Sequence, residues 1–321
     1  MKKFLSLVLA MSMVFAVTGC KGKTEEKPNA ENKNKDAIQI GIVQIVQHPS
    51  LDTIRTSIVE RLEETLDVPF EIDYKNANND QSNLNSITQK FVGDEKDLII
   101  AIATPSAQSA MAQTTDIPIV FSAVTSPEAA GIEGDNITGT SDRIPVEKIF
   151  SLAKELTPGI KKVGFVYNSG EANSLAVIQE AKDYLKSQGI EFEEATITNT
   201  SELQQTAQSL AEKCDALFSP IDNTVASAMA VLSDIACEMK KPLYVGADSM
   251  VIDGGLATVG IDYTVLGKET ADIATEIIKG KSPSEIPYKV LDNFAVLINK
   301  ETAEKIGVNI PQEILDKATI V

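Results

Sequence analysis

The chain alternates short strand-like runs with amphipathic helical stretches, and it runs through this alternation twice. In the first half, helical stretches at Thr53–Leu66 and around Leu84–Phe91 separate strand-like runs. The runs rich in β-branched and apolar residues are Ile38–Val46, Phe70–Tyr74, Leu98–Ala103 and Ile117–Ala123. Such alternation predicts a parallel sheet with right-handed helical crossovers.

The second half repeats this order. The strand-like runs are Lys162–Tyr167, Ile190–Ile197, Ala216–Ser219 and Leu243–Gly246, with helical stretches at Leu175–Leu185, Leu203–Leu210 and Val225–Met239 between them. In both halves an apolar strand leads into a polar loop and then a helix of small residues. The repeat predicts two lobes of one α/β architecture, each a parallel sheet flanked by helices, with a hinged cleft between them.

The lobes are not predicted to be continuous in sequence. We expect a first lobe of residues 38–142 plus about 262–288, and a second lobe of residues 143–261 plus about 289–321. After Gly260, the pattern predicts a helix at Leu266–Ile278, a strand at Phe294–Ile298 and a short helix at Glu301–Ile306. Several crossings between the lobes would build the hinge.

The first residues have the layout of a secretory signal. Lys2 and Lys3 precede an apolar run, Phe4–Val17, that is short for a membrane span, and Val17-Thr18-Gly19-Cys20 follows. A Cys after a small residue resembles the bacterial lipobox, in which the Cys thiol is acylated. The alternative is an ordinary signal with an incidental Cys. We expect residues 1–19 to be removed, and residues 20–37 to be a lipidated Cys20 and a polar tether.

Composition excludes several classes of function. A formal net charge of −17 disfavours nucleic acid, because phosphate contacts need Lys and Arg. A single His, and the absence of any Cys-x-x-Cys, predict neither a metal site nor a cofactor. Besides Cys20, the chain has Cys214 and Cys237, which either pair or remain buried thiols.

Polar loops follow the predicted strands, where ligands bind in open parallel sheets. These loops are Gln47–Asp52, Thr104–Ala107, Val124–Pro127, Asn168–Ser174 and Asp222–Thr224, and Asp248 adds a further point. Thr104-Pro105-Ser106 opens a predicted helix, so its free N–H groups could bind a carboxylate, or Thr104 could be a simple cap. Glu171, Asp222 and Asp248 could pair with an ammonium group. The sole His, His48, lines the cleft mouth or packs the first loop.

These loops resemble those of ABC-transporter substrate-binding lipoproteins of the type that binds tryptophan, tyrosine or phenylalanine. The resemblance rests on the stretches beginning at Gly41, Ala101, Val120, Tyr167, Pro220 and Asp262 and covers essentially the whole body. It implies a periplasmic-binding-protein fold of type I. Thr104, Ser106 and Ala107, helped by Thr125, would hold the ligand carboxylate. The opposing wall would be formed by Asn168, Glu171, Asn173, Ser174, Asp222, Asn223 and Asp248, with Asp222 or Asp248 meeting the ammonium.

Apolar contacts are expected near Leu51, Val124 and Tyr167. Ser126 departs from the family pattern, which has Asp in Thr-Asp-Pro, and this leaves the ligand's identity open.

The leading hypothesis is therefore a monomeric, lipid-anchored binding protein on the extracytoplasmic face of the cell membrane. It would bind an amino acid and deliver it to an ABC permease and its ATPase. One alternative is a surface-anchored two-lobed hydrolase or lyase, although the sequence contains no Gly-x-Ser-x-Gly elbow and no Gly-rich phosphate loop. The other alternative is a ligand sensor that uses the same cleft.

Overall fold

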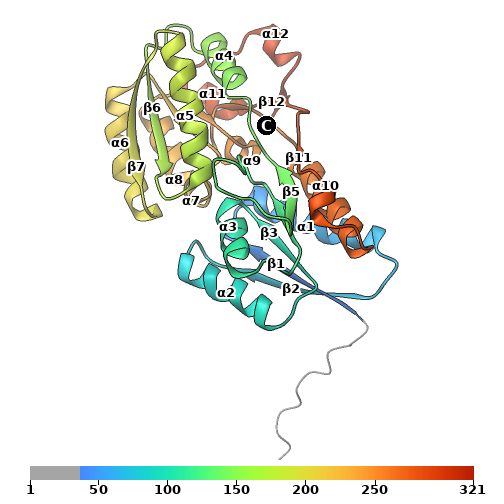
Figure 1. Cartoon of the computed structure of the whole chain (residues 1–321). Helices are drawn as coiled ribbons and strands as arrows, with labels where there is room; N and C mark the ends of the chain where they lie inside the picture. Colours follow the sequence, from blue (N-terminus) through green and yellow to red (C-terminus); the bar gives the residue numbers. More distant parts are fainter. Residues whose placement is uncertain (1–36) are drawn as a thin grey trace, which may run out of the picture. The chain divides into compact units, whose positions relative to one another are not determined.

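The strands form two separate sheets, as the repeat predicts (Figure 1). The computed structural model describes residues 37–321. The predicted signal, the lipidation of Cys20 and nearly all of the tether lie outside the described residues. No helix among residues 37–321 is long and apolar enough to cross a membrane.

The first sheet has six strands in the order β11-β5-β4-β3-β1-β2, all parallel to their neighbours. The strands are β1 (Ile38–Gln44), β2 (Phe70–Asn76), β3 (Leu98–Ile102), β4 (Ile119–Ser122), β5 (Ile137–Ser141) and β11 (Lys289–Val290). Its helices are α1 (Pro49–Thr65), α2 (Gln81–Gly93), α3 (Thr104–Gln113) and α10 (Tyr263–Ile278). Helix α1 packs on α10, and α2 packs on α3.

The second sheet has seven strands in the order β13-β12-β10-β9-β8-β6-β7. They are β6 (Lys162–Asn168), β7 (Glu191–Ile197), β8 (Ala216–Ser219), β9 (Leu243–Val245), β10 (Ala257–Gly260), β12 (Ala295–Ile298) and β13 (Thr319–Ile320). The helices are α4 (Val146–Leu156), α5 (Ala172–Ser187), α6 (Leu203–Lys213), α7 (Asn223–Ala226), α8 (Met229–Glu238), α9 (Asp248–Ile252), α11 (Lys300–Ile306) and α12 (Gln312–Leu315). Strand β12 runs antiparallel to β10, so this sheet is not wholly parallel.

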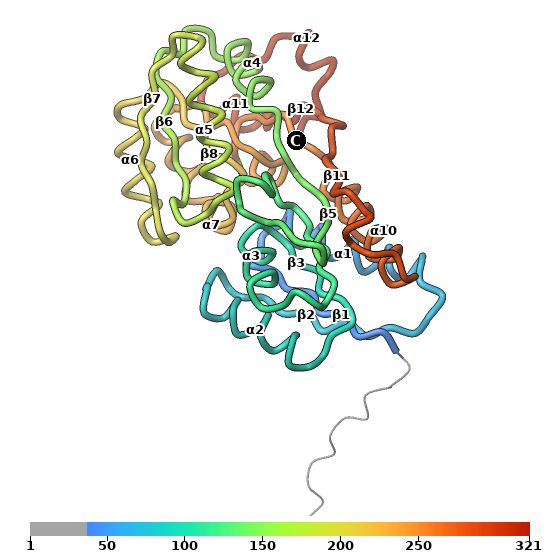
Figure 2. The backbone as a smooth tube through the Cα atoms, in the orientation of Figure 1, coloured from blue at the N-terminus to red at the C-terminus, as the bar shows by residue number. Residues whose placement is uncertain are grey.

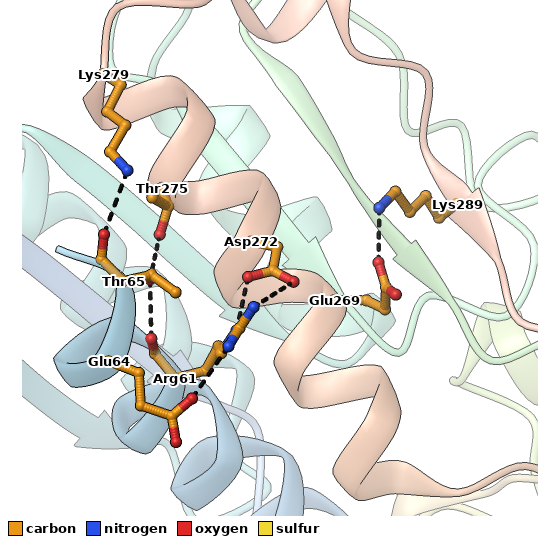
Figure 3. A network of polar contacts seen from close by, with 8 residues as sticks. All are labelled: Arg61, Glu64, Thr65, Glu269, Asp272, Thr275, Lys279 and Lys289. Carbon is orange, nitrogen blue, oxygen red and sulfur yellow. Dashed lines mark hydrogen bonds and ion pairs between the residues drawn. The ribbon is translucent and has the colours of Figure 1, made fainter.

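Helix α10 follows strands of the second sheet in sequence but packs on the first. Figure 3 shows the polar contacts that hold it to α1: Arg61 Nε donates to Asp272 Oδ1 at 2.8 Å, and the Thr65 and Thr275 hydroxyls lie 2.8 Å apart. The two helices are close enough that a Cβ at Gly267 would lie 2.7 Å from the Ile54 carbonyl oxygen. This close packing fixes the first lobe around a segment from late in the chain.

The chain crosses between the two sheets three times, and the path can be followed in Figure 2. The crossings are residues 142–145, 261–262 and 291–294. The last crossing follows β11, which pairs with β5, so the chain leaves the first lobe after Val290 and not at about residue 288. Three adjacent connections are the construction expected of a hinge.

Several elements differ from the sequence-based predictions. Strands β5 and β10 are absent from the sequence-based predictions, and β5 is a polar strand. Its hydroxyls are satisfied in the core: Thr140 Oγ1 lies 2.7 Å from Thr270 Oγ1. The helix predicted at Val225–Met239 is divided into α7 and α8, because Ala228 leaves the helical conformation at φ −130° and ψ 28°. Cys214 and Cys237 are free thiols.

Candidate ligand-binding site

The predicted site residues all lie at or just after the carboxyl ends of strands. In the first lobe, Thr104, Ser106 and Ala107 begin α3, and Val124 and Thr125 follow β4. In the second lobe, Asn168 ends β6, and Glu171, Asn173 and Ser174 lie at the start of α5. Asp222 and Asn223 lie at the start of α7, and Asp248 begins α9. All are buried except Asp248, which is partly buried. Helices α3 and α5 approach each other across the two lobes.

The first turn of α3 carries polar groups without partners. Ala107 N donates to Ala103 O, whereas the N–H of Ser106 has no preceding helical carbonyl within reach. Thr104 Oγ1 and Ser106 Oγ are buried and have no hydrogen-bond partner among the described residues. The N-cap is Ala103, and no side chain caps this helix, so the capping interpretation of Thr104 is wrong. Buried polar groups are nearly always paired, so this turn is suited to accepting a ligand anion.

Two alanines on this edge have a backbone conformation that alanine rarely adopts. Ala103 has φ 76° and Ala123 has φ 56°, and they directly follow β3 and β4. A positive φ at a non-glycine residue stores strain on the order of 1 kcal/mol or more, and such residues gather at ligand sites. The sequence did not identify these two positions, because alanine is not a residue that predicts a left-handed backbone.

Glu171 lies at the centre of a hydrogen-bond network within the second lobe. Its carboxylate accepts from the backbone N–H groups of Asn223 (3.0 Å) and Thr224 (2.9 Å), at the start of α7. It also accepts from the side chains of Asn223 (2.6 Å), Thr224 (2.8 Å) and Asn173 (3.1 Å). A carboxylate that accepts five hydrogen bonds at a helix N-terminus is already satisfied by the protein.

Asp222 is similarly occupied. It accepts from Asn168 N (2.7 Å), Ser174 Oγ (2.7 Å) and Val225 N (2.8 Å), so it joins the end of β6 to the starts of α5 and α7. Burial, together with the nearby charge of Glu171, raises the pKa of Asp222 to about 7. Of the three carboxylates predicted to meet an ammonium group, Glu171 and Asp222 are therefore built into the wall of the second lobe.

Side chains of the two lobes are hydrogen-bonded to each other across the site. His48 Nε2 lies 3.3 Å from Asn223 Oδ1, Asn79 Nδ2 donates to Thr224 Oγ1 at 3.0 Å, and the hydroxyls of Ser50 and Ser249 are paired. Asn223 and Thr224 are the residues that Glu171 orients, so the network of the second lobe holds two of the three cross-lobe contacts in place.

His48 occupies the boundary of the lobes, as one of its two predicted roles required. Its ring is buried, and burial lowers its pKa despite the nearby Glu171 carboxylate. A pocket of about 350 Å³ lies beside it, lined from the first lobe by residues 47–49 and from the second by residues 226–231 and Asp253. No nucleophile or acid–base partner pairs with His48 among the described residues.

Asp142 and Tyr263 belong to this region but were not predicted. Asp142 directly follows β5 and accepts from Thr125 Oγ1 at 2.8 Å and from the Tyr263 hydroxyl at 3.5 Å. Burial raises the pKa of Asp142 to about 6, and burial of Tyr263 beside the charges of Asp142 and Asp248 raises the pKa of that hydroxyl. Asp142 was not predicted as a site residue because β5 was not predicted as a strand.

Asp248 has few partners. Within residues 37–321 its side chain accepts a hydrogen bond from the adjacent Ser249 N at 2.7 Å, and burial raises its pKa to about 6. Tyr167, expected to offer apolar contact, instead donates its hydroxyl to Glu194 at 2.8 Å within the second sheet. No group of His, Cys, Asp and Glu side chains in residues 37–321 is arranged to hold a metal ion.

Comparisons with known proteins agree with this architecture. The family model described as ABC transporter substrate binding protein matches residues 39–321. A tyrosine-binding protein of Clostridioides difficile is 40% identical over 314 residues, which cover 94% of this chain and 91% of the relative.

Two solved structures superpose on this chain to different degrees. A Streptococcus pneumoniae ABC domain in complex with L-Trp is 36% identical, covers 89% of this chain and 99% of its own, and superposes with a TM-score of 0.86. A ligand-free, open substrate-binding protein from Clostridium difficile is 38% identical with the same coverage, yet its TM-score is 0.67. The two structures are nearly equally identical to this chain, yet the open structure has the lower TM-score. This difference agrees with the cross-lobe hydrogen bonds, and both indicate a closed arrangement here.

The type I periplasmic-binding-protein fold and the binding-protein hypothesis are thus confirmed, and the enzyme alternative gains no support. The chain belongs to the ABC transporter substrate-binding protein family.

Proposed function

We propose that this protein binds an aromatic amino acid between its lobes and delivers it to an ABC permease and its ATPase. The proposal rests on two opposite chemistries among the residues of the site. The first turn of α3 offers a free N–H and two unpartnered hydroxyls for a carboxylate, while buried carboxylates nearby have no cationic partner within residues 37–321. A zwitterion satisfies both.

The aromatic preference follows from the relatives. One is named for tyrosine and another was solved with L-Trp. In this proposal Thr104, Ser106 and Ala107 hold the ligand carboxylate, Thr125 donates its hydroxyl to Asp142, and Val124 contributes apolar surface. Asn168, Asn173, Ser174 and Asn223 form the opposing wall, which Glu171 and Asp222 support from behind.

A calorimetric and thermal-shift screen tests the ligand class. A form lacking residues 1–20 is titrated with all common amino acids, several sugars and nucleosides. A ligand present at 100 times its Kd stabilises the folded protein by about 2.7 kcal/mol. Tyrosine, tryptophan or phenylalanine should give this shift without being consumed, as mass spectrometry of the recovered ligand would show. A shift from sugars or nucleosides alone, or turnover of the ligand, would contradict the proposal.

We further propose that the protein acts as a monomer on the extracytoplasmic face of the membrane, anchored through lipid on Cys20. The support is the Val17-Thr18-Gly19-Cys20 sequence, followed by a polar segment without large apolar residues. Cys20→Ser should release the protein from the membrane fraction and remove a lipid adduct seen by mass spectrometry. Retention of the variant in the membrane would contradict lipid anchoring.

A further inference from the structure

His48, the only histidine of the chain, makes a contact between the lobes through one of its two ring nitrogens. It directly precedes α1 in the first lobe, and its Nε2 lies 3.3 Å from Oδ1 of Asn223 at the start of α7 in the second lobe. Asn223 belongs to the opposing wall of the proposed ligand site. The contact therefore links the position of this ring to the position of a wall residue.

The hydrogen bonds of Asn223 fix which nitrogen of His48 carries the proton. The Asn223 amide Nδ2 donates to Glu171 Oε2 at 2.6 Å, so its Oδ1 faces His48 as an acceptor. His48 Nε2 must then be the donor, and in the neutral ring Nδ1 carries only a lone pair. The network around Glu171 thus selects one tautomer of His48.

The other ring nitrogen, Nδ1, has no acceptor for a second proton. It is buried without a hydrogen-bond partner among the described residues, and His48 as a whole is only 7% exposed. Protonation would place a charged N–H at this atom with nothing to accept it, which is costly in a buried position. The closed arrangement therefore accommodates the neutral ring and disfavours the imidazolium.

The charged groups that act on His48 within residues 37–321 are acidic, and they do not remove this cost. Burial is the largest influence on the pKa of His48 and holds it below its ordinary value of 6.5. The hydrogen bond to Asn223 and the charges of Glu171 and Asp52 raise this pKa, but burial outweighs them. Asp253 lines the adjoining pocket from the second lobe.

Opening of the lobes would remove the penalty on the charged ring. The pocket beside His48 is lined by residues 47–49 of the first lobe and residues 226–231 of the second, so separating the lobes exposes the ring to water. A solvated histidine has a pKa of about 6.5 and gains a proton as the pH falls through that value. Acid would therefore stabilise the open arrangement relative to the closed one.

We propose that His48 is a positioning residue that holds Asn223 only while its ring is neutral, so that acidification releases this contact, favours the open lobes and weakens ligand binding. The inference rests on the proposed function, since it assumes that a ligand binds in the closed arrangement. It adds a dependence on external pH that is carried by one group outside the proposed ligand contacts.

NMR of the imidazole protons tests the inference in the wild type, because a single histidine gives a single titration curve. The form lacking residues 1–20, prepared without a histidine tag, is titrated with acid in the absence and presence of saturating L-tyrosine. The pKa of His48 should be lower in the presence of tyrosine, because the ligand favours the closed arrangement and binding is linked to the proton in both directions. An equal or higher pKa with tyrosine would overturn the inference.

Calorimetry then compares tyrosine affinity at pH 7.5 and pH 5.5 in three proteins. A solvated histidine is about one-tenth protonated at the first pH and about nine-tenths at the second, so His48 should contribute a loss of about fivefold or more. His48→Gln, whose amide can still donate to Asn223 but does not titrate, should lose about fivefold less affinity than the wild type. Ser50→Ala removes a cross-lobe contact without a titrating group and should keep the wild-type ratio of the two affinities.

The outcomes separate the inference from the proposed function. If the wild type binds no aromatic amino acid, both fail. If it binds tyrosine and His48→Gln loses as much affinity on acidification as the wild type, only the inference fails. If His48→Gln does not fold, the NMR titration of the wild type decides the question alone.

Discussion

Two pairs of acidic residues lie at this site, all buried except the partly buried Asp248, and their surroundings differ. Within residues 37–321, Glu171 and Asp222 accept eight hydrogen bonds between them, all from their own lobe. Asp142 and Asp248 together accept three, one of them from an adjacent backbone N–H. The first pair organises the starts of α5 and α7. The second pair has fewer hydrogen bonds and no cationic partner within residues 37–321.

The comparison teaches that an acidic residue at a strand end is not enough to identify a ligand contact. Hydrogen bonds from the protein's own N–H and O–H groups occupy the acceptor positions of a carboxylate, and such a group has little capacity left for a ligand. A carboxylate with few donors and no cation raises the free energy of the empty protein and gains the most from a bound ammonium. Substitution should therefore damage stability at one pair and affinity at the other.

The largest expected effect is on stability at the saturated pair. Glu171→Ala should lower the free energy of unfolding by about 2–4 kcal/mol, because Asn223 and Thr224 lose the acceptor for buried donors. Urea denaturation of the ligand-free protein measures this loss, and Glu171→Gln, which keeps one acceptor oxygen, should lose less. If the Glu171→Ala variant were fully stable but no longer bound ligand, Glu171 would act in affinity and not in stability, which would contradict the proposed difference between the two pairs.

The next effect is on pH dependence at the unsatisfied pair. The folded-state pKa values of Asp142 and Asp248, about 6, exceed their ordinary value of 3.8. Their contribution to the stability of the ligand-free protein is therefore greatest below pH 4 and is lost as the pH rises through 6. The stability difference between the wild type and the Asp142→Asn, Asp248→Asn double variant should change across pH 4–7.

The affinity for an ammonium ligand should change in the other direction. It should fall as the pH is lowered through 6, because protonated carboxylates no longer attract the cation, and this fall should be smaller in the double variant. Denaturation and calorimetry at a series of pH values measure the two curves. Parallel curves for the wild type and the double variant would show that these groups do not titrate as the structure indicates.

The sequence predicted the fold more completely than it predicted the roles of the acidic residues. The repeated alternation of strand and helix patterns located most strands. The rule that ligands bind beyond the carboxyl ends of parallel strands located Thr104, Glu171, Asp222 and Asp248 at the lobe edges. It could not locate Asp142, because β5 is a short polar strand whose hydroxyls find partners far along the chain: Thr138 Oγ1 donates to Ile286 O, and Thr140 Oγ1 lies 2.7 Å from Thr270 Oγ1 of α10. Hydrogen-bond saturation is a property of the folded backbone, so the sequence could not separate the two acidic pairs.

The smallest expected effect concerns the cross-lobe contacts that the saturated pair supports. Asn79→Gly removes the amide that donates to Thr224 Oγ1 while tolerating the left-handed backbone at residue 79, where φ is 58°. One neutral hydrogen bond contributes about 1 kcal/mol, so ligand affinity should fall by about fivefold.

The change should be in dissociation more than in association, because the contact exists only between closed lobes. Ser50→Ala removes the hydroxyl pair with Ser249 at a separate point of the same boundary, and it should have a similar effect. The two losses should be nearly additive because the sites share no partner. Stopped-flow measurement of ligand release checks both. If either variant slowed association alone, the contact would act before closure and would not belong with the wall that Glu171 and Asp222 hold in place.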